Sequence, residues 1–414
     1  METKTDHSSD IRKWLKVALA EENLENFSVK VTGTSEKGDG YVADIIFVIV
    51  KGTDTQGKDK HYDLVLKCSK SSVALMENVP AFRNAFVREA YMYENVFPLF
   101  KEFQVNKSIE KPFDSVPKCY GVFSDEFRHV IVLENLKKLG YDLWPRGKPL
   151  TREVINIVIK HYAIFHATSV ALEEHYPEKF QKLLNDSTDD VVKKIMESSA
   201  FLKMFQGAVE EIYHLLTNDV RNDILEKWLK LKDQVFFILC EMTPGVGDLQ
   251  VINHGDSWVN NFLYKFQNEE RTIVSSVAIL DWQNSKFTSP VTDLSYFLFA
   301  GISKEDIADM DTILRDYYKY FCKYLRRLES KFADKYTLDQ FFDEWRKYSK
   351  YGALLCILPI KSLYTEKEDL PDIAETANRG AEISDFFKFV TKDKSGFKDR
   401  LRPIVEYAVK NNLI

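Results

Sequence analysis

The feature of this sequence that most constrains its fold is a change of hydrophobic period about a third of the way along the chain. Between residues 27 and 70, apolar and polar residues alternate in three runs bounded by glycines and polar residues, which is typical of half-buried strands joined by turns. Residues 81–97 show helical spacing, and a hairpin pattern follows as far as about residue 135. From Thr151 onward the spacing is 3.6 residues nearly to the end, which predicts long amphipathic helices.

The length of 414 residues exceeds the size at which a single core usually stops growing, so two lobes are expected. We predict an α+β, bilobal architecture with a β-rich N-terminal lobe, residues 1–135, and a larger, mainly helical C-terminal lobe, residues 136–414. Pro98 is expected to end the helix of the first lobe. Two short β-like runs within residues 248–283 predict a small β-island among the helices of the second lobe.

Net charge and cysteine content narrow the class of protein. The chain carries 57 basic and 63 acidic residues, a formal charge of −6, without a lysine- or arginine-rich block, so neither nucleic acid nor an anionic membrane is an expected partner. Its five cysteines are scattered, which indicates free thiols in a reducing compartment. The N-terminus lacks the apolar stretch of a secretory signal, and no apolar run reaches the roughly 18 residues of a membrane span. We expect a cytoplasmic protein.

The segment HGDSWVNNF, residues 254–262, carries the strongest chemical signal. Phosphoryl transfer to an alcohol requires a carboxylate that orients the acceptor hydroxyl and takes its proton, and a nearby amide oxygen that helps to hold Mg²⁺ against the phosphates. Asp256 and Asn261, five residues apart on a loop outside a strand, supply both groups. We assign Asp256 as the catalytic base and Asn261 as a metal ligand.

A second acid follows at the end of an apolar strand. In AILDWQ, Asp281 stands 25 residues after Asp256, a spacing that suits a hairpin with both acids at one phosphate site. We assign it as the second metal ligand, bridging Mg²⁺ to the nucleotide. Either aspartate alone has an ordinary alternative as a turn cap. Their order after a β-rich lobe favours an ATP-dependent kinase with Mg²⁺ as its cofactor.

These two segments resemble those of the insect ecdysteroid-kinase-like proteins, relatives of the choline and aminoglycoside kinases within the protein-kinase-like fold. HGDSWVNNFLYKF is similar to that family's HGDxWxxN loop, in which Trp258 is a narrower marker than HGD alone. ILDWQNSKFTSPVTDLSYFL is similar to its second signature, usually Asp-Phe-Gln followed by Pro-x-x-Asp-Leu, with Trp282 in place of the usual Phe. The resemblance covers nearly the whole chain and implies a protein-kinase-like fold and an alcohol phosphotransferase.

Lys67 ends the strand LVLK, where kinases place the lysine that binds the α- and β-phosphates of ATP. Strand alternation puts it on the face opposite Leu64 and Leu66, so an ordinary solvent-facing lysine is the alternative. Glu89 favours the functional interpretation, because it falls on the apolar stripe of its helix, where an unpaired carboxylate is costly. We therefore predict a Lys67–Glu89 ion pair.

Two further segments are assigned to the nucleotide. GTSEKGDGYVADIIFVIV places Gly38 and Gly40 before a strand, which suits a hairpin folded over phosphates. The family more often has Asn and Ser where this chain has Gly40 and Ala43, and an ordinary tight hairpin is the alternative. VIVLENL resembles the strand and hinge between lobes, which implies hydrogen bonds between adenine and the backbone of Glu134 and Leu136.

Three polar residues are given structural roles. The resemblance places His161 and His166 on the first long helix of the C-terminal lobe, where we expect buried histidines with satisfied hydrogen bonds. Asp293, in PVTDL, is interpreted as a helix cap or as a support for the catalytic loop rather than as a third metal ligand.

The acceptor is the remaining partner. The resemblance implies that helices within residues 171–245 and 340–414 enclose it, and the aromatic-rich segments SSAFLKMF and YGALLCILPIKSLY fit a bulky apolar alcohol better than a cation. We predict an ecdysteroid or a related steroid or xenobiotic, phosphorylated in hormone inactivation or detoxification. A choline- or aminoglycoside-type kinase, and a pseudokinase that binds nucleotide or steroid without turnover, stay open as alternatives.

Overall fold

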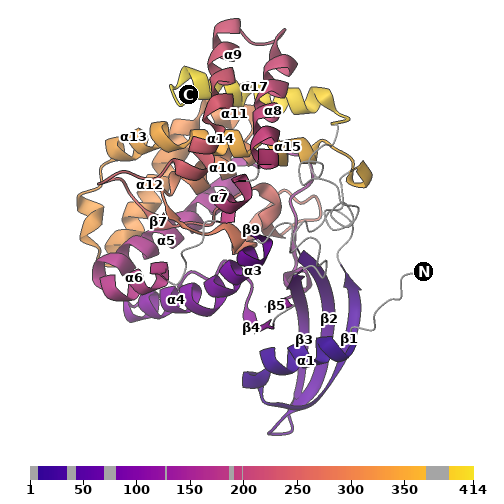
Figure 1. Ribbon diagram of the computed structural model, residues 1–414. Helices are drawn as coiled ribbons and strands as arrows, with labels where there is room; N and C mark the ends of the chain where they lie inside the picture. The colour runs from indigo at the N-terminus through magenta and orange to yellow at the C-terminus, as the bar shows by residue number, and fades with distance from the viewer. Residues whose placement is uncertain are drawn as a thin grey trace.

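The computed structural model describes residues 8–34, 43–69, 81–125, 128–185, 191–197, 199–369 and 391–414. The predicted phosphate-loop glycines, Gly38 and Gly40, lie outside the described residues. Figure 1 shows a sheet with its helices joined to a larger helical part. This arrangement confirms the predicted α+β class, with a β-rich N-terminal part and a mainly helical remainder.

The N-terminal sheet contains five antiparallel strands in the order β1-β2-β3-β5-β4. Strand alternation buries Leu64 and Leu66 on one face, while Val65 and Lys67 belong to the other. The last strand ends at Glu134, next to the lobe boundary predicted at residue 135. The strands are β1 (Leu24–Thr34), β2 (Ala43–Asp54), β3 (Asp59–Ser69), β4 (Cys119–Ser124) and β5 (His129–Glu134).

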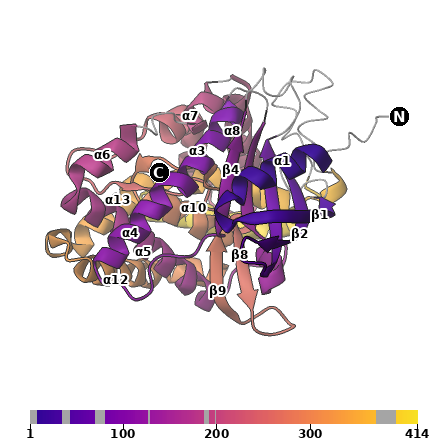
Figure 2. The ribbon, with the colours of Figure 1, turned by 90° about the horizontal axis from the view of Figure 1, so that it is seen from below.

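Helix α1 (Ser8–Ala18) covers one face of this sheet (Figure 2). The apolar stripe of the helix is buried in one cluster with side chains from β2, β3, β4 and β5. The apolar residues of α1, spaced at the helical period of 3.6 residues, therefore form one stripe that packs on one face of the sheet. The stripe consists of Ile11, Trp14, Leu15, Ala18 and, just beyond the helix, Leu19.

The opposite face of the sheet packs against a helical segment that changes its winding. Helix α3 (Ala81–Tyr91) passes through a π-helical turn (Met92–Val96) into α4 (Phe97–Asn106). The expectation that Pro98 ends the helix is therefore wrong. A proline ring clashes with the carbonyl four residues earlier, which here belongs to Glu94 inside the wider π turn, and the first turn of α4 needs no N–H from Pro98.

The C-terminal part is built around α5, against which α4, α6, α10 and α12 pack. Helix α5 is long and apolar enough to cross a membrane, but 72% of its most apolar window is buried inside the protein, as in a core helix. The helices are α5 (Arg152–His175), α6 (Pro177–Asn185), α7 (Val191–Met196), α8 (Ser199–Leu216), α9 (Asn222–Leu229), α10 (Val291–Gly301), α11 (Lys304–Ala308), α12 (Met310–Arg327), α13 (Leu338–Tyr348), α14 (Lys350–Leu355), α15 (Ile357–Leu363) and α17 (Lys394–Lys410).

The predicted β-island is present as two small sheets. One has the order β6-β8-β9 and the other pairs β10 with β7. The loop with the HGD motif connects β7 to β8, and Asp281 follows β9. Asp256 therefore lies in the loop between two island strands, and Asp281 lies just after a third. The strands are β6 (Tyr141–Asp142), β7 (Val251–Ile252), β8 (Phe262–Phe266), β9 (Val274–Ile279) and β10 (Phe287–Thr288).

Candidate active site

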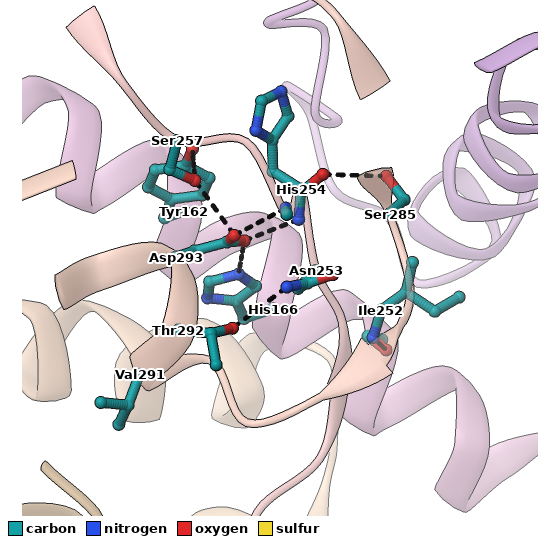
Figure 3. A network of polar contacts seen from close by, with 12 residues as sticks. Tyr162, His166, Ile252, Asn253, His254, Ser257, Ser285, Val291, Thr292 and Asp293 are labelled. Carbon is teal, nitrogen blue, oxygen red and sulfur yellow. Dashed lines mark hydrogen bonds and ion pairs between the residues drawn. The ribbon is translucent and has the colours of Figure 1, made fainter. Parts of the chain in front are cut away.

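The loop between β7 and β8 is held by one buried carboxylate. Asp293, in the first turn of α10, is 1% exposed. Its oxygens accept hydrogen bonds from the backbone N–H groups of His254 (2.7 Å) and Gly255 (2.8 Å) and from the Ser257 hydroxyl (3.0 Å) (Figure 3). These contacts lead to the loop rather than to the start of α10, which fits the predicted support of the loop and not a helix cap.

His166 extends this network from α5. It is fully buried, with Nε2 3.2 Å from Asp293 Oδ2 and Nδ1 2.9 Å from the Tyr317 hydroxyl. Burial acts to raise the pKa of Asp293, but the hydrogen bonds from His166 and the loop outweigh it and lower that pKa. Both ring nitrogens of His166 thus have partners, as expected of a structural histidine. The other predicted structural histidine, His161, lies 2.5 Å from the Ser115 hydroxyl through Nδ1.

Gly255 allows the loop to turn tightly. Its φ of 84° lies in the left-handed region, and a Cβ there would lie 2.1 Å from the carbonyl oxygen of Asn284. The neighbouring His254 donates from Nε2 to the carbonyl of Leu280 (2.7 Å). This bond joins the HGD loop to the residue that precedes Asp281, and so ties the two acidic motifs together.

Asp256 lies at the centre of the loop and is half-buried. Its Oδ1 accepts a long hydrogen bond of 3.4 Å from the Tyr296 hydroxyl. Burial, followed by the charge of Asp281, raises the pKa of Asp256 to about 7. A carboxyl group with a pKa near neutrality gains and loses a proton readily at physiological pH, which suits a general base.

Asn261 is fixed next to both acids. Its Nδ2 donates to the backbone carbonyl of Asp256 (2.8 Å), and its own backbone carbonyl accepts from the N–H of Leu280 (2.8 Å). Because the amide nitrogen is engaged, the amide oxygen is left for another partner. Together with the carboxylate of Asp281 it offers the oxygen donors that Mg²⁺ prefers.

Lys67 connects the N-terminal sheet to the second acid. Its Nζ lies 2.5 Å from Glu89 Oε2 and also contacts Asp281 Oδ1, 214 residues further along the chain. The predicted Lys67–Glu89 contact is therefore present. Burial acts to lower the pKa of Lys67, but the two carboxylates outweigh it and raise that pKa. Burial also raises the pKa of Glu89, to about 7, in spite of the lysine.

The backbone turns sharply at Asp281, which has φ 66° and ψ 59°. This left-handed conformation is uncommon outside glycine and persists only where the surroundings enforce it. The next residue, Trp282, is fully buried, with its ring 4.9 Å from Phe97, 4.8 Å from Phe165 and 4.6 Å from His254. A tryptophan in place of the family's usual phenylalanine is thus accommodated, and its packing enforces the turn that presents Asp281.

The predicted hinge residues lie at the end of β5. The backbone N–H of Glu134 donates to the carbonyl of Lys118 (2.9 Å). Leu136 begins a 3₁₀ turn, so its N–H has no partner within that turn. Binding of adenine to this backbone stays a prediction.

One of the two segments predicted to enclose the acceptor packs on α10, the helix that carries Tyr296. A Cβ on Gly352 of α14 would lie 2.2 Å from the carbonyl carbon of Ser295 and 2.3 Å from the backbone nitrogen of Tyr296, so α14 and α10 touch backbone to backbone. Helix α17 in turn contacts α14 and α15, and also α8 from the other predicted segment.

Sequence reasoning did not assign a role to Tyr296. The available signal was its position three residues after Asp293 in a helical segment, because residues three apart lie on the same helix face. The residue that approaches Asp256 and the residue that holds its loop therefore share one face of α10.

Comparisons with known proteins complete the description. A family model described as the ecdysteroid kinase-like family matches residues 37–330. Among solved structures, a GDP complex of an aminoglycoside 2′-phosphotransferase mutant has 12% identity over 98% of both chains, with a TM-score of 0.39. A glucosamine kinase in complex with glucosamine, ADP and inorganic phosphate has 9% identity over 88% of this chain and 95% of that one, with a TM-score of 0.31. No curated protein matches the chain.

The family match classifies the chain. The matched region contains Lys67, Glu89, Asp256, Asn261 and Asp281. Because the match extends over more than half of the chain, the protein belongs to the ecdysteroid kinase-like family and is a small-molecule kinase with a hydroxyl group as acceptor.

Proposed function

We propose that this protein transfers the γ-phosphoryl group of ATP to a hydroxyl of a bulky, largely apolar alcohol, with Asp256 as the base. The observation that carries the proposal is the contact of Lys67 with both Glu89 and Asp281. A buried lysine held between carboxylates from two distant segments, with a half-buried aspartate nearby, is the arrangement that phosphoryl transfer uses.

Lys67 is the proposed partner of the α- and β-phosphates. Its raised pKa keeps the ammonium charged, and the buried carboxylate of Glu89 holds it in place. Adenine is proposed to bond to the backbone of Glu134 and Leu136. Triphosphate and adenine would then lie between the sheet and the β-island.

Asn261 and Asp281 are the proposed ligands of Mg²⁺. Magnesium is usually held by one or two protein oxygens together with phosphates and water, so this small donor set is sufficient. In the part of the chain that the structure describes, no group of three or more His, Cys, Asp or Glu side chains forms an alternative site. When bound, the ion would neutralise charge on the phosphates.

The chemical step is assigned to Asp256. Its carboxylate orients the acceptor hydroxyl and takes the proton while the acceptor oxygen forms a bond to the γ-phosphorus. The bond from that phosphorus to the β–γ bridging oxygen breaks, and ADP leaves with the electron pair. A pKa of about 7 lets Asp256 return the proton to solvent near neutral pH.

The acceptor is proposed to be an ecdysteroid or a related apolar alcohol. Family membership supports this class, as does the apolar character of α14 and α15, in which Leu355 and Leu358 are only partly buried. Helix α14 packs directly on α10 beside Tyr296, whose hydroxyl contacts the base. An apolar acceptor surface would thus adjoin the reacting group.

An acceptor panel tests this proposal. Purified protein with Mg²⁺ and ATP would receive ecdysone, plant sterols, choline, glucosamine and kanamycin in parallel, with ADP release followed and products identified by mass spectrometry. We expect a phosphate ester of the steroid, formed about 10²- to 10⁴-fold more slowly by the Asp256→Asn variant, which controls for contaminating kinases.

Other outcomes separate the alternatives. Turnover of choline or aminoglycosides alone would overturn the apolar acceptor and retain the kinase. Nucleotide binding without any phosphorylated product across the panel would favour a pseudokinase.

A further inference from the structure

We infer that Tyr296 is a positioning residue for the catalytic base, holding the carboxylate of Asp256 while Asp293 holds the backbone of its loop. The inference rests on the proposed function, since Tyr296 acts only through Asp256. It assigns to α10 a second task beside support of the loop.

The contact itself is the first argument. Tyr296 is 5% exposed, and its hydroxyl donates to Asp256 Oδ1 at 3.4 Å. Most buried hydroxyl groups have a hydrogen-bond partner, and here the partner is the proposed base. A phenylalanine would fill nearly the same volume without this bond. Tyr264 offers a contrast, because it is fully buried and its hydroxyl has no hydrogen-bond partner among the described residues.

The position of Tyr296 on α10 is the second argument. Asp293 bonds to groups on both sides of Asp256 in the chain, namely Gly255 and Ser257. Tyr296, one helical turn later on the same face, bonds to the side chain between them. Residues of one rigid helix, α10, thus hold both the backbone around Asp256 and its carboxylate. Tyr296 holds one oxygen, Oδ1, of the carboxylate that is proposed to take the acceptor proton.

Helix α14, which belongs to a segment proposed to enclose the acceptor, packs against α10 at Tyr296. The absence of a side chain at Gly352 lets α14 approach the backbone of Tyr296 within van der Waals contact. The packing of α14 therefore helps to set the position of Tyr296 relative to Asp256. Displacement of a reacting group by about 1 Å can lower a rate about 100-fold, so the loss of such a bond should affect turnover rather than nucleotide binding.

A double-mutant cycle tests the inference. The variants are Tyr296→Phe, Asp256→Asn and their combination, with Tyr264→Phe as the matched control. The measurements are kcat and the KM for ATP with ecdysone as acceptor, basal ATP hydrolysis with water as acceptor, and the melting temperature to verify folding.

We expect Tyr296→Phe to lower kcat about 10- to 100-fold with the KM for ATP unchanged. In the Asp256→Asn background the same substitution should change kcat less than about twofold, because the carboxylate through which it acts is gone. Tyr264→Phe should leave kcat as in the wild type.

Equal losses in both backgrounds, or a KM for ATP that rises with the loss of kcat, would assign Tyr296 to packing and overturn the inference. An unchanged kcat in Tyr296→Phe would do the same while leaving the proposed function intact. Failure of the proposed function is distinguishable, since the wild type would then turn over no faster than Asp256→Asn.

Discussion

At the scale of single residues, Asp256 combines a near-neutral pKa with fixed partners. Burial and the charge of Asp281 raise its pKa to about 7, while Tyr296 contacts its carboxylate and Asn261 its backbone carbonyl. The ability of Asp256 to take a proton and the orientation of its side chain are thus separate properties. A substitution that keeps the shape of the side chain distinguishes them.

The substitution Asp256→Asn keeps the shape of the side chain and removes its ability to take a proton. We expect kcat to fall about 10²- to 10⁴-fold, the usual share of a positioned general base. The dissociation constant of ATP, measured by calorimetry, should stay near the wild-type value. Wild-type kcat in this variant, with an acceptor that the wild type phosphorylates, would contradict the assignment.

The substitution Asp281→Asn tests the metal. It removes the negative charge that faces Lys67 and the proposed Mg²⁺. We expect ADP to bind the wild type more tightly with Mg²⁺ than without it, and this gain to be largely lost in the variant. Asp343→Asn, an exposed carboxylate on α13, is the control and should keep the gain. An undiminished effect of Mg²⁺ in Asp281→Asn would rule out Asp281 as a ligand.

At the scale of elements, the crossing of α10 and α14 depends on the absence of a side chain at Gly352. Alanine there would place its Cβ 2.2 Å from the carbonyl carbon of Ser295, so the helices would have to separate. We expect Gly352→Ala to lower the free energy of unfolding by about 3 kcal/mol, the upper range for overpacking. The measurement is urea denaturation.

A second glycine-to-alanine substitution, at Gly207, should change the free energy of unfolding in the opposite direction. Gly207 is exposed in α8 and has no atom within 4 Å of an added Cβ. Gly207→Ala should therefore stabilise the protein by about 0.5–1 kcal/mol, through helix propensity alone. Equal destabilisation by both substitutions would show that the close crossing at Gly352 is not the cause.

Helix α13 contributes a pH-dependent contact to the segment that precedes β7 and the HGD loop. Glu344 accepts hydrogen bonds from the backbone N–H of Leu249 (3.0 Å) and the Tyr336 hydroxyl (3.0 Å). Burial raises its pKa from 4.5 to about 7. Between these values the folded protein binds a proton that the unfolded chain releases, so this group lowers the free energy of unfolding as pH rises through that window.

Glu344→Gln has no such proton to lose. We therefore expect its free energy of unfolding, relative to the wild type, to increase between pH 5 and pH 8. Urea denaturation at steps of one pH unit measures this difference in free energy. The control is Glu305→Gln, at an exposed position of α11, for which we expect the difference from the wild type to be the same at each pH. A pH-independent difference for Glu344→Gln would refute the raised pKa.

At the scale of the whole molecule, Lys67 provides one of the contacts between the two parts of the chain. It lies on β3, pairs with Glu89 from α3, and reaches Asp281 beyond β9 in the C-terminal part. A nucleotide that binds at this junction would stabilise both parts at once.

Thermal unfolding with ADP and Mg²⁺ tests this coupling. A ligand at 100 times its dissociation constant stabilises a protein by about 2.7 kcal/mol. We expect the melting temperature of the wild type to rise because of this stabilisation. The rise should be much smaller for Lys67→Ala, since this variant lacks a side chain that is proposed to bind the phosphates. Lys179→Ala, an exposed lysine on α6, should behave as the wild type. Equal shifts in all three proteins would exclude Lys67 from the nucleotide site.

Much of the fold and part of the site follow from local pattern. Strand alternation assigned Lys67 and Leu66 to opposite faces, and a carboxylate on an apolar helix stripe predicted the contact of Glu89 with Lys67. The continuation of the helix past Pro98 was missed, because a π turn relieves the clash that a regular helix would suffer.

The class of fold, the order of the two parts and the residues of the acidic motifs could be predicted from the amino-acid sequence, because hydrophobic period and motif spacing are properties of neighbouring residues. Two contacts could not be predicted in this way: Asp281 shares Lys67 with Glu89, and Tyr296 contacts Asp256 from the helix that carries Asp293. These contacts join segments up to 214 residues apart, and their geometry depends on how helices and strands pack rather than on the local chain.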